Sequence, residues 1–207
     1  MMDLYTFGTS NGFRASIALE EAGAPYRAHR VDVTKDEQKQ DWFRALNPIG
    51  AIPVLVDPDG PGGAAITLTQ SFAIVQYVAQ KFGILMPREP RAAVRMLEWF
   101  MAAASDTGPL YGIANFYVRQ TPGVPAALRD KFENRLREYY ADLDRHLGGH
   151  RYLAGDAYSI ADIATISTVY RNKLVMPELV PPLPHLGRWY AEVLARPAVQ
   201  RGFKVPG

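Results

Sequence analysis

Two short stretches of this sequence could bind a ligand through their backbone: Ile52-Pro53 and Gln70-Ser71. Proline cannot donate to a sheet ladder and favours extended geometry in the preceding residue, so Pro53 should begin a strand and leave the N–H and C=O of Ile52 free. An extended peptide can pair with such groups as an added strand. Ser71 is a favourable helix N-cap, and a helix N-terminus attracts carboxylates. These features suggest a site for a short peptide with an acidic end, although an ordinary strand and helix would show the same pattern.

The sequence contains no cysteine. This excludes disulfides, thiolate metal ligands and a cysteine nucleophile on the protein. The four histidines show no metal-ligand spacing, so no metal site is expected. If the protein does thiol chemistry, the thiol must therefore come from a ligand.

The composition is that of a folded, water-soluble protein, with 48% apolar and 21% charged residues. Lys and Arg exceed Asp and Glu by only two, and neither sign forms a block, so nucleic acid and anionic membranes are not expected partners. The first ten residues lack the pattern of a signal peptide, and no stretch is apolar enough to span a membrane. We therefore expect a cytoplasmic protein.

The elements that would position these residues alternate in the first part of the chain. Strands are expected over residues 3–7, 25–33, from Pro53 onward and over 66–69, and helices over 13–22, 37–46 and from Ser71. Asn11 or Ser10 would cap the first helix. The order βαβαββα predicts a compact α/β domain over residues 1–83, with its first two strands parallel.

The rest of the chain is expected to be helical. Pro87 and Pro90 indicate a linker over residues 84–91, and nothing in residues 92–207 has the pattern of a strand. Long helices are predicted over residues 92–118, with a kink near Gly108-Pro109, and over 126–147, with shorter ones toward the end. The segment Ser159-Ile160-Ala161-Asp162 has the pattern of a capping box. The sequence thus predicts an all-α C-terminal domain over residues 92–207.

The three separated motifs Ile52-Pro53, Gln70-Ser71 and Ser159-Ile160-Ala161-Asp162, in this order and setting, resemble the cytosolic glutathione S-transferase family. The resemblance implies a thioredoxin-like N-terminal domain, an all-helical second domain, a homodimer, and glutathione as co-substrate without a metal. In that family the residue before a cis-proline pairs with the cysteinyl backbone of glutathione, and the acidic or Gln residue and the Ser hold its γ-glutamyl end. These roles fall on Ile52, Pro53, Gln70 and Ser71.

The opening segment with Thr9-Ser10-Asn11 most resembles the bacterial branch related to the yeast nitrogen-regulation prion protein, a nu-class-like group. In that branch a Thr-x-Asn pair faces the glutathione sulfur, which implies Thr9 and Asn11, with Ser10 as a third candidate. A glutamine that binds glutathione there falls on Gln38. The branch usually has Glu-Ser where this chain has Gln70-Ser71. Turn and cap formation is the alternative role for Thr9 and Asn11.

The resemblance also implies a second-substrate pocket, for which Tyr111 and Phe116 are the candidates, and places Asp106 near the glutathione of a partner subunit. We expect a detoxification enzyme, a glutathione transferase in which the glutathione thiolate attacks a hydrophobic electrophile. The first alternative is a disulfide reductase that uses two glutathiones, and peroxidase activity would be related to it. The second is a non-catalytic binding or regulatory protein with the same fold.

Overall fold

The computed structural model describes residues 1–206, which form two compact units. The first unit joins residues 1–84 to residues 195–206, and the second is Leu85–Leu194. The sequence places the division in the linker over residues 84–91 and assigns the whole remainder to the helical domain. In the structure the final segment instead groups with the first unit.

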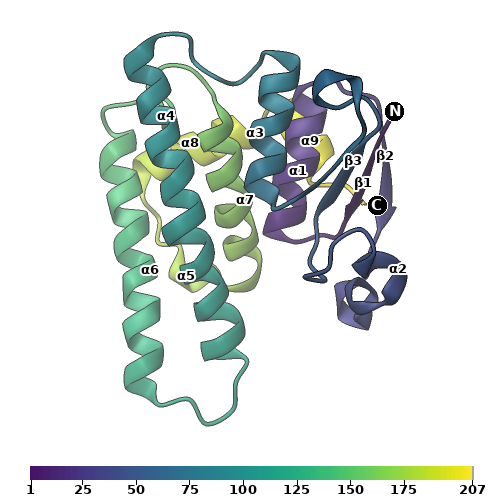
Figure 1. Ribbon diagram of the computed structural model, residues 1–207. Helices are drawn as coiled ribbons and strands as arrows, with labels where there is room; N and C mark the ends of the chain where they lie inside the picture. The colour runs from purple at the N-terminus through teal and green to yellow at the C-terminus, as the bar shows by residue number, and fades with distance from the viewer. Residues whose placement is uncertain (207) are drawn as a thin grey trace. The chain divides into compact units, whose positions relative to one another are not determined.

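The first unit contains a four-stranded mixed sheet (Figure 1). Its spatial order is β2-β1-β3-β4, formed by β1 (Met2–Thr6), β2 (Tyr26–Arg30), β3 (Val54–Asp57) and β4 (Ile66–Thr69). β1 and β2 are parallel, with Met2 opposite Tyr26. β3 is antiparallel to both of its neighbours, with Val54 opposite Tyr5 on one side and Thr69 on the other. The thioredoxin-like arrangement of an initial βαβ unit and a later hairpin is thereby confirmed.

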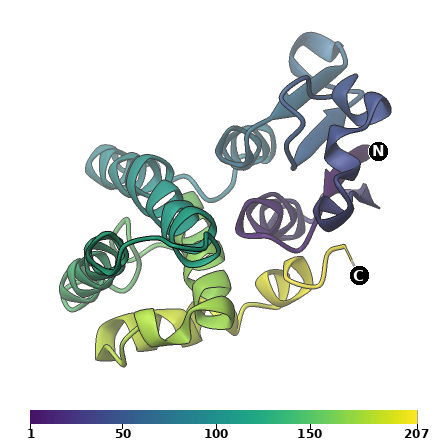
Figure 2. The ribbon, with the colours of Figure 1, turned by 90° about the horizontal axis from the view of Figure 1, so that it is seen from below.

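Two helices, α1 (Ser10–Glu21) and α3 (Ser71–Phe82), lie side by side on one face of this sheet, as Figures 1 and 2 show. The strands present their buried residues Leu4 and Leu55 to that face because side chains alternate along a strand. α3 ends at Gly83, whose φ of 66° is the left-handed conformation that glycine adopts without strain.

The final helix α9 (Pro197–Gly202) packs against α1. The Ser16 hydroxyl donates to the Gly202 carbonyl at 2.7 Å, and a Cβ added to Gly202 would lie 2.6 Å from the Ile17 side chain. Arg196 forms a two-pronged ion pair with Glu21, with distances of 2.7 and 2.8 Å. These contacts attach the last residues of the chain to its first helix.

The opposite face of the sheet is covered by a shorter segment than the sequence predicts. In place of a helix over residues 37–46 the structure has the 3-10 turn η2 (Glu37–Lys39) and the single helical turn α2 (Asp41–Arg44), and a further 3-10 turn, η1 (Val33–Lys35), precedes them. Gln40 is extended, with φ −71° and ψ 152°, and this interrupts the helix. Phe43 of α2 is fully buried in a cluster with Val31 and Val54, against which Tyr5 packs.

The second unit consists of helices only, with the bounds α4 (Pro90–Ala102), η4 (Ala103–Thr107), α5 (Gly108–Gly112), η5 (Ile113–Arg119), α6 (Ala126–Leu147), α7 (Ile160–Val175), η6 (Pro177–Leu179) and α8 (Pro184–Leu194). α4 to η5 occupy the predicted long helix. The kink expected at Gly108-Pro109 takes the form of two π-helical segments, η4 and η5, on either side of α5. η3 (Pro61–Gly63), a 3-10 turn, belongs to the hairpin of the first unit.

The predicted capping box opens α7. The Asp162 carboxylate accepts from the Ser159 backbone N–H at 2.9 Å, and also from Leu153 N–H at 3.1 Å and from Trp189 Nε1 at 2.8 Å. Asp162 is fully buried, and burial raises its pKa to about 6. This one carboxylate therefore joins the start of α7, the preceding loop and α8.

Candidate glutathione site

The loop that leads into β3 is shaped by the side chain of Asn47. Its Nδ2 donates to the Ala51 carbonyl at 2.7 Å, and its Oδ1 accepts from Ile49 N–H at 3.2 Å. Gly50 has φ 67°, and a Cβ there would lie 2.9 Å from the backbone oxygen of Gln38. Glycine is therefore required at this position.

The Ile52–Pro53 peptide bond at the end of this loop is cis. Among residues 1–206, no backbone hydrogen bond is formed by the N–H or C=O of Ile52. The strand pairs begin only at Val54. The backbone of Ile52 is thus free to pair with an extended ligand, as the sequence predicts.

The start of α3 provides the second half of the candidate site. The sequence makes Ser71 the N-cap, but in the structure Ser71 is the first helical residue and Gln70 occupies the cap position without a side-chain cap bond. Gln70 has φ 68° and ψ 111°, a combination outside the regions that residues with a Cβ normally occupy. Strain of this kind is typical of ligand-binding residues. Ser71, 6% exposed, lies among the backbone N–H groups that a helix leaves unbonded at its first turn.

The start of α1 carries the three residues implied as thiol-binding. Thr9 is the N-cap, and its Oγ1 accepts from Gly12 N–H at 3.1 Å, which corrects the expectation that Asn11 or Ser10 caps the helix. A Cβ on Gly12 would lie 2.0 Å from the Phe7 carbonyl, so the turn requires glycine there. The capping bond uses Thr9 Oγ1 as acceptor, and the hydroxyl hydrogen remains available as a donor. Ser10 is buried, whereas Asn11 is exposed.

Asn11 and Ser71 meet across the two helices. The Ser71 hydroxyl donates to Asn11 Oδ1 at 3.5 Å. Arg14, on the next turn of α1, donates through Nη1 to both Asn11 Oδ1 and Ser71 Oγ. Burial lowers the pKa of Arg14 to about 9. The structure thus brings together two of the residues implied by the sequence around an arginine that sequence reasoning missed.

Gln38 lies in η2, apart from these hydrogen bonds. Its Nε2 donates to Asp36 Oδ1 at 3.4 Å, and its Oε1 is buried without a partner among residues 1–206. A buried amide oxygen without a hydrogen-bond donor is uncommon, and an N–H or O–H group of a bound ligand would satisfy it. Its backbone oxygen is close to Gly50.

Both units match known families. The model of the glutathione S-transferase N-terminal domain matches residues 10–81, and that of the glutathione S-transferase C-terminal domain matches residues 100–197. The chain belongs to the glutathione S-transferase family. The chain is 31% identical over 205 residues to the disulfide-bond oxidoreductase YfcG of Escherichia coli strain K12. The match covers 96% of this chain and 92% of YfcG.

Solved structures of the family agree with this assignment. A glutathione transferase from Pseudomonas putida, with one glutathione disulfide bound per subunit, has a TM-score of 0.91 and 36% identity, with coverage of 100% of this chain and 92% of that one. The transferase URE2P6 from Phanerochaete chrysosporium, in complex with oxidized glutathione, has a TM-score of 0.86 and 25% identity, covering 98% and 93%. This second protein is fungal, whereas the opening segment most resembles the bacterial branch related to the yeast prion protein.

The remaining residues predicted for this transferase lie in its helical unit. Asp106 is exposed in the π-helical segment η4, and Phe116 is 54% exposed in η5. Tyr111 is only 4% exposed, and burial raises its pKa. Tyr111 is therefore part of the helical core, which leaves Phe116 as the more accessible of the two pocket candidates.

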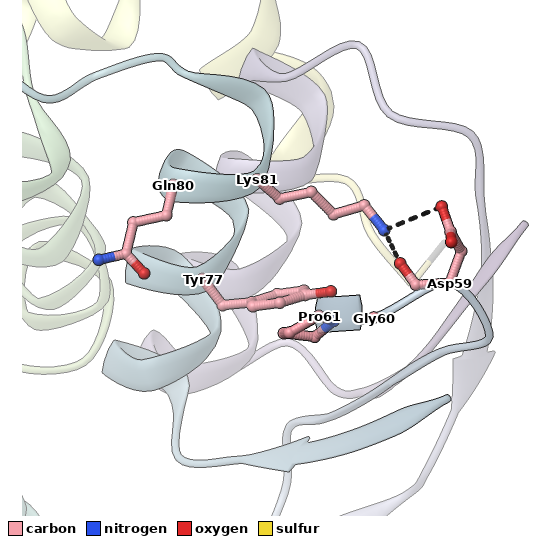
Figure 3. A pocket seen from close by; sticks show the side chains of 6 residues that line it. All are labelled: Asp59, Gly60, Pro61, Tyr77, Gln80 and Lys81. Carbon is pink, nitrogen blue, oxygen red and sulfur yellow. Dashed lines mark hydrogen bonds and ion pairs between the residues drawn. The ribbon is translucent and has the colours of Figure 1, made fainter. Parts of the chain in front are cut away.

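A hollow of about 400 Å³ also occurs in the first unit, between α3 and the β3–β4 hairpin (Figure 3). Tyr77 and Lys81 line it, and both bind the buried carboxylate of Asp57 at 2.6 Å. Lys81 also donates to the backbone oxygen of Asp59 and pairs with the Asp59 carboxylate at 3.8 Å, as the dashed lines in Figure 3 mark. The charges of this hollow are thus paired internally, and none of the residues implied as glutathione-binding lines it.

Within residues 1–206, no group of three or more His, Asp or Glu is arranged to hold a metal ion. None of the helices in this described part is both long and apolar enough to cross a membrane. The cytoplasmic location stays a prediction.

Proposed function

We propose that this transferase binds glutathione along Ile52 and at the N-terminus of α3, and that it uses the glutathione thiolate to attack an electrophile. The observation that carries the proposal is the combination of an unpaired Ile52 backbone with a strained Gln70 next to Ser71. Ile52 would pair with the cysteinyl backbone of glutathione. The Ser71 hydroxyl and the first N–H groups of α3 would hold the γ-glutamyl carboxylate.

The thiol would be activated at the start of α1. A free thiol has a pKa near 8.5, and lowering it by two units requires about 2.7 kcal/mol of differential stabilisation. A charge-assisted hydrogen bond contributes about 1.5–3 kcal/mol. The available Thr9 hydroxyl and the exposed Asn11 amide are the proposed donors, whereas the burial of Ser10 makes it the weaker candidate. Gln38 would accept from the ligand through its unpartnered Oε1.

Two of the similar proteins favour a second reaction, disulfide reduction. The transferase from Pseudomonas putida holds glutathione disulfide, and YfcG is a disulfide-bond oxidoreductase. The thiolate of one glutathione would attack a disulfide, forming a mixed disulfide and releasing one thiolate. A second glutathione would then attack the mixed disulfide, giving glutathione disulfide and the second thiol. This scheme is compatible with the cysteine-free sequence because glutathione supplies both reducing sulfurs.

We further propose a homodimer. α4 exposes Val94, Leu97 and Met101, three apolar residues spaced as one stripe of a helix, with exposed fractions of 67%, 46% and 45%. A second copy of the chain would cover this stripe, and Asp106 in the next turn would reach the partner's glutathione. Leu97→Glu should convert the dimer to a monomer in light-scattering measurements. A monomeric wild type would contradict the dimer.

The decisive experiment is calorimetric titration with glutathione, followed by turnover of an aryl halide and of hydroxyethyl disulfide. Dominant aryl halide turnover would support the transferase, and dominant disulfide turnover would support the reductase. Binding without turnover of either would favour a binding or regulatory role.

A pair of hydroxyl deletions tests the location of the site. Ser71→Ala should weaken glutathione binding by about 1–3 kcal/mol, because a carboxylate loses a hydroxyl donor. Thr67→Ala, which removes an exposed hydroxyl from the adjacent strand β4, is the matched control and should bind as the wild type does. Equal dissociation constants for the two variants would remove Ser71 from the site.

A further inference from the structure

Arg14 occupies an unusual position for a charged side chain. It is 1% exposed, and its guanidinium carbon lies 4.4 Å from the centroid of the Phe72 ring. Its Nη1 donates to Asn11 Oδ1 and, at 3.4 Å, to Ser71 Oγ. One buried guanidinium thus connects the first turn of α1 with the first turn of α3.

These contacts determine which way the Asn11 amide points. An asparagine side chain ends in one acceptor oxygen and one donor nitrogen, whereas arginine has only donors. Oδ1 must therefore face Arg14, and Nδ2 with its two N–H groups is turned away from it. Because Asn11 is exposed, Nδ2 can donate to an atom of a ligand.

The second contact of Asn11 would not persist with glutathione bound. Ser71 Oγ donates to Asn11 Oδ1 at 3.5 Å. A hydroxyl has one hydrogen, so Ser71 cannot donate to Asn11 and to a ligand carboxylate through the same bond. Once Ser71 binds the carboxylate, Arg14 is the donor that still holds Asn11 Oδ1.

We infer that Arg14 is a positioning residue, which orients the Asn11 amide so that Nδ2 donates to the glutathione sulfur. The inference rests on the proposed function and adds to it a residue that acts through Asn11. It makes the acidity of the bound thiol depend on a side chain that faces the protein interior. A merely structural arginine would affect folding and binding but would leave the acidity of the bound thiol unchanged.

The test is a double-mutant cycle read out by the pKa of bound glutathione, measured from the ultraviolet absorbance of the thiolate as a function of pH. Asn11→Ala and Arg14→Met should each raise this pKa by about one unit, a tenfold loss of thiolate at a given pH below it. The double variant should show no greater shift than Asn11→Ala alone, because Arg14 acts through Asn11. Additive shifts, or no shift in Arg14→Met, would overturn the inference.

A second variant covers the case in which Arg14→Met does not fold, since Asn11 is at the surface. Asn11→Asp retains an oxygen that accepts from Arg14 but has no N–H to donate and adds a negative charge. It should raise the thiol pKa at least as far as Asn11→Ala does, and an unchanged or lower pKa would overturn the inference. Calorimetry on the wild type comes first, because failure to bind glutathione would refute the proposed function itself, and the inference with it, before any variant is compared.

Discussion

The conformation of Gln70 makes a quantitative prediction about stability. At φ 68° and ψ 111° its Cβ is crowded, and such strain costs about 1–3 kcal/mol. Gln70→Gly removes the Cβ and the strain, but the unfolded chain gains freedom that costs about 0.5–1 kcal/mol. Gln70→Ala keeps the strain while losing the same amide. The glycine variant should therefore be more stable than the alanine variant by about 1 kcal/mol.

The assay is urea unfolding of both variants. Their free energies of unfolding are compared with the same slope against urea concentration for both. Gln80 provides a matched control, because it is an exposed glutamine of the same helix in ordinary helical geometry. At that position glycine should be less stable than alanine by about 1 kcal/mol, the reverse order. If glycine is also the less stable variant at Gln70, the strain does not exist. Both Gln70 variants should weaken glutathione binding equally, since both lack the amide.

Three further predictions concern other parts of the molecule. Thr9→Ala should raise the pKa of bound glutathione by about one to two units, because one charge-assisted hydrogen bond is lost, whereas Thr9→Ser should titrate as the wild type does. Equal titrations of all three proteins would make Thr9 a cap only. Gly12→Ala should destabilise the first unit by about 3 kcal/mol or more, measured by urea unfolding, because its Cβ would overlap the Phe7 carbonyl, and a change below 1 kcal/mol would contradict this. The pKa of Asp162 is raised to about 6 by burial, from about 3.9 when unfolded, so the free energy of unfolding should fall by about 3 kcal/mol as pH rises from about 4 to 6 and then level off. Asp162→Asn should lack this decline, and parallel pH profiles of the two proteins would refute the assignment.

Motif and periodicity were enough to predict the strands, the hairpin and the capping box, because each depends on local residue types. They did not select the helix starts. Thr9, Ser10 and Asn11 are all good caps, and residue type alone does not distinguish them. The structure selects Thr9 through the backbone of the turn, which brings Gly12 close to the Phe7 carbonyl and its N–H to Thr9 Oγ1. Likewise, the capping rule favours Ser71, whereas the structure places the cap at Gln70.

The failed predictions have similar causes. The helix expected over residues 37–46 is interrupted at the extended Gln40, and at its start the Glu37 side chain accepts from the Asp32 backbone N–H at 2.7 Å. Such local side-chain bonds compete with helix formation. The sequence does not single out Arg14, because an arginine three residues after Asn11 is usually a surface residue. The available signal was its place in a segment otherwise rich in small and apolar residues.

The attachment of α9 to α1 has a consequence for synthesis of the protein on the ribosome. Ser16 and its partner Gly202 are separated by 186 positions, so the surface of α1 around Ile17 stays uncovered until the residues of α9 have been translated. Residues 85–194 emerge earlier and hold all the parts of the helical unit. The nascent chain would therefore complete its helical unit before its first unit, and a truncation before residue 197 would expose apolar surface on α1 to aggregation.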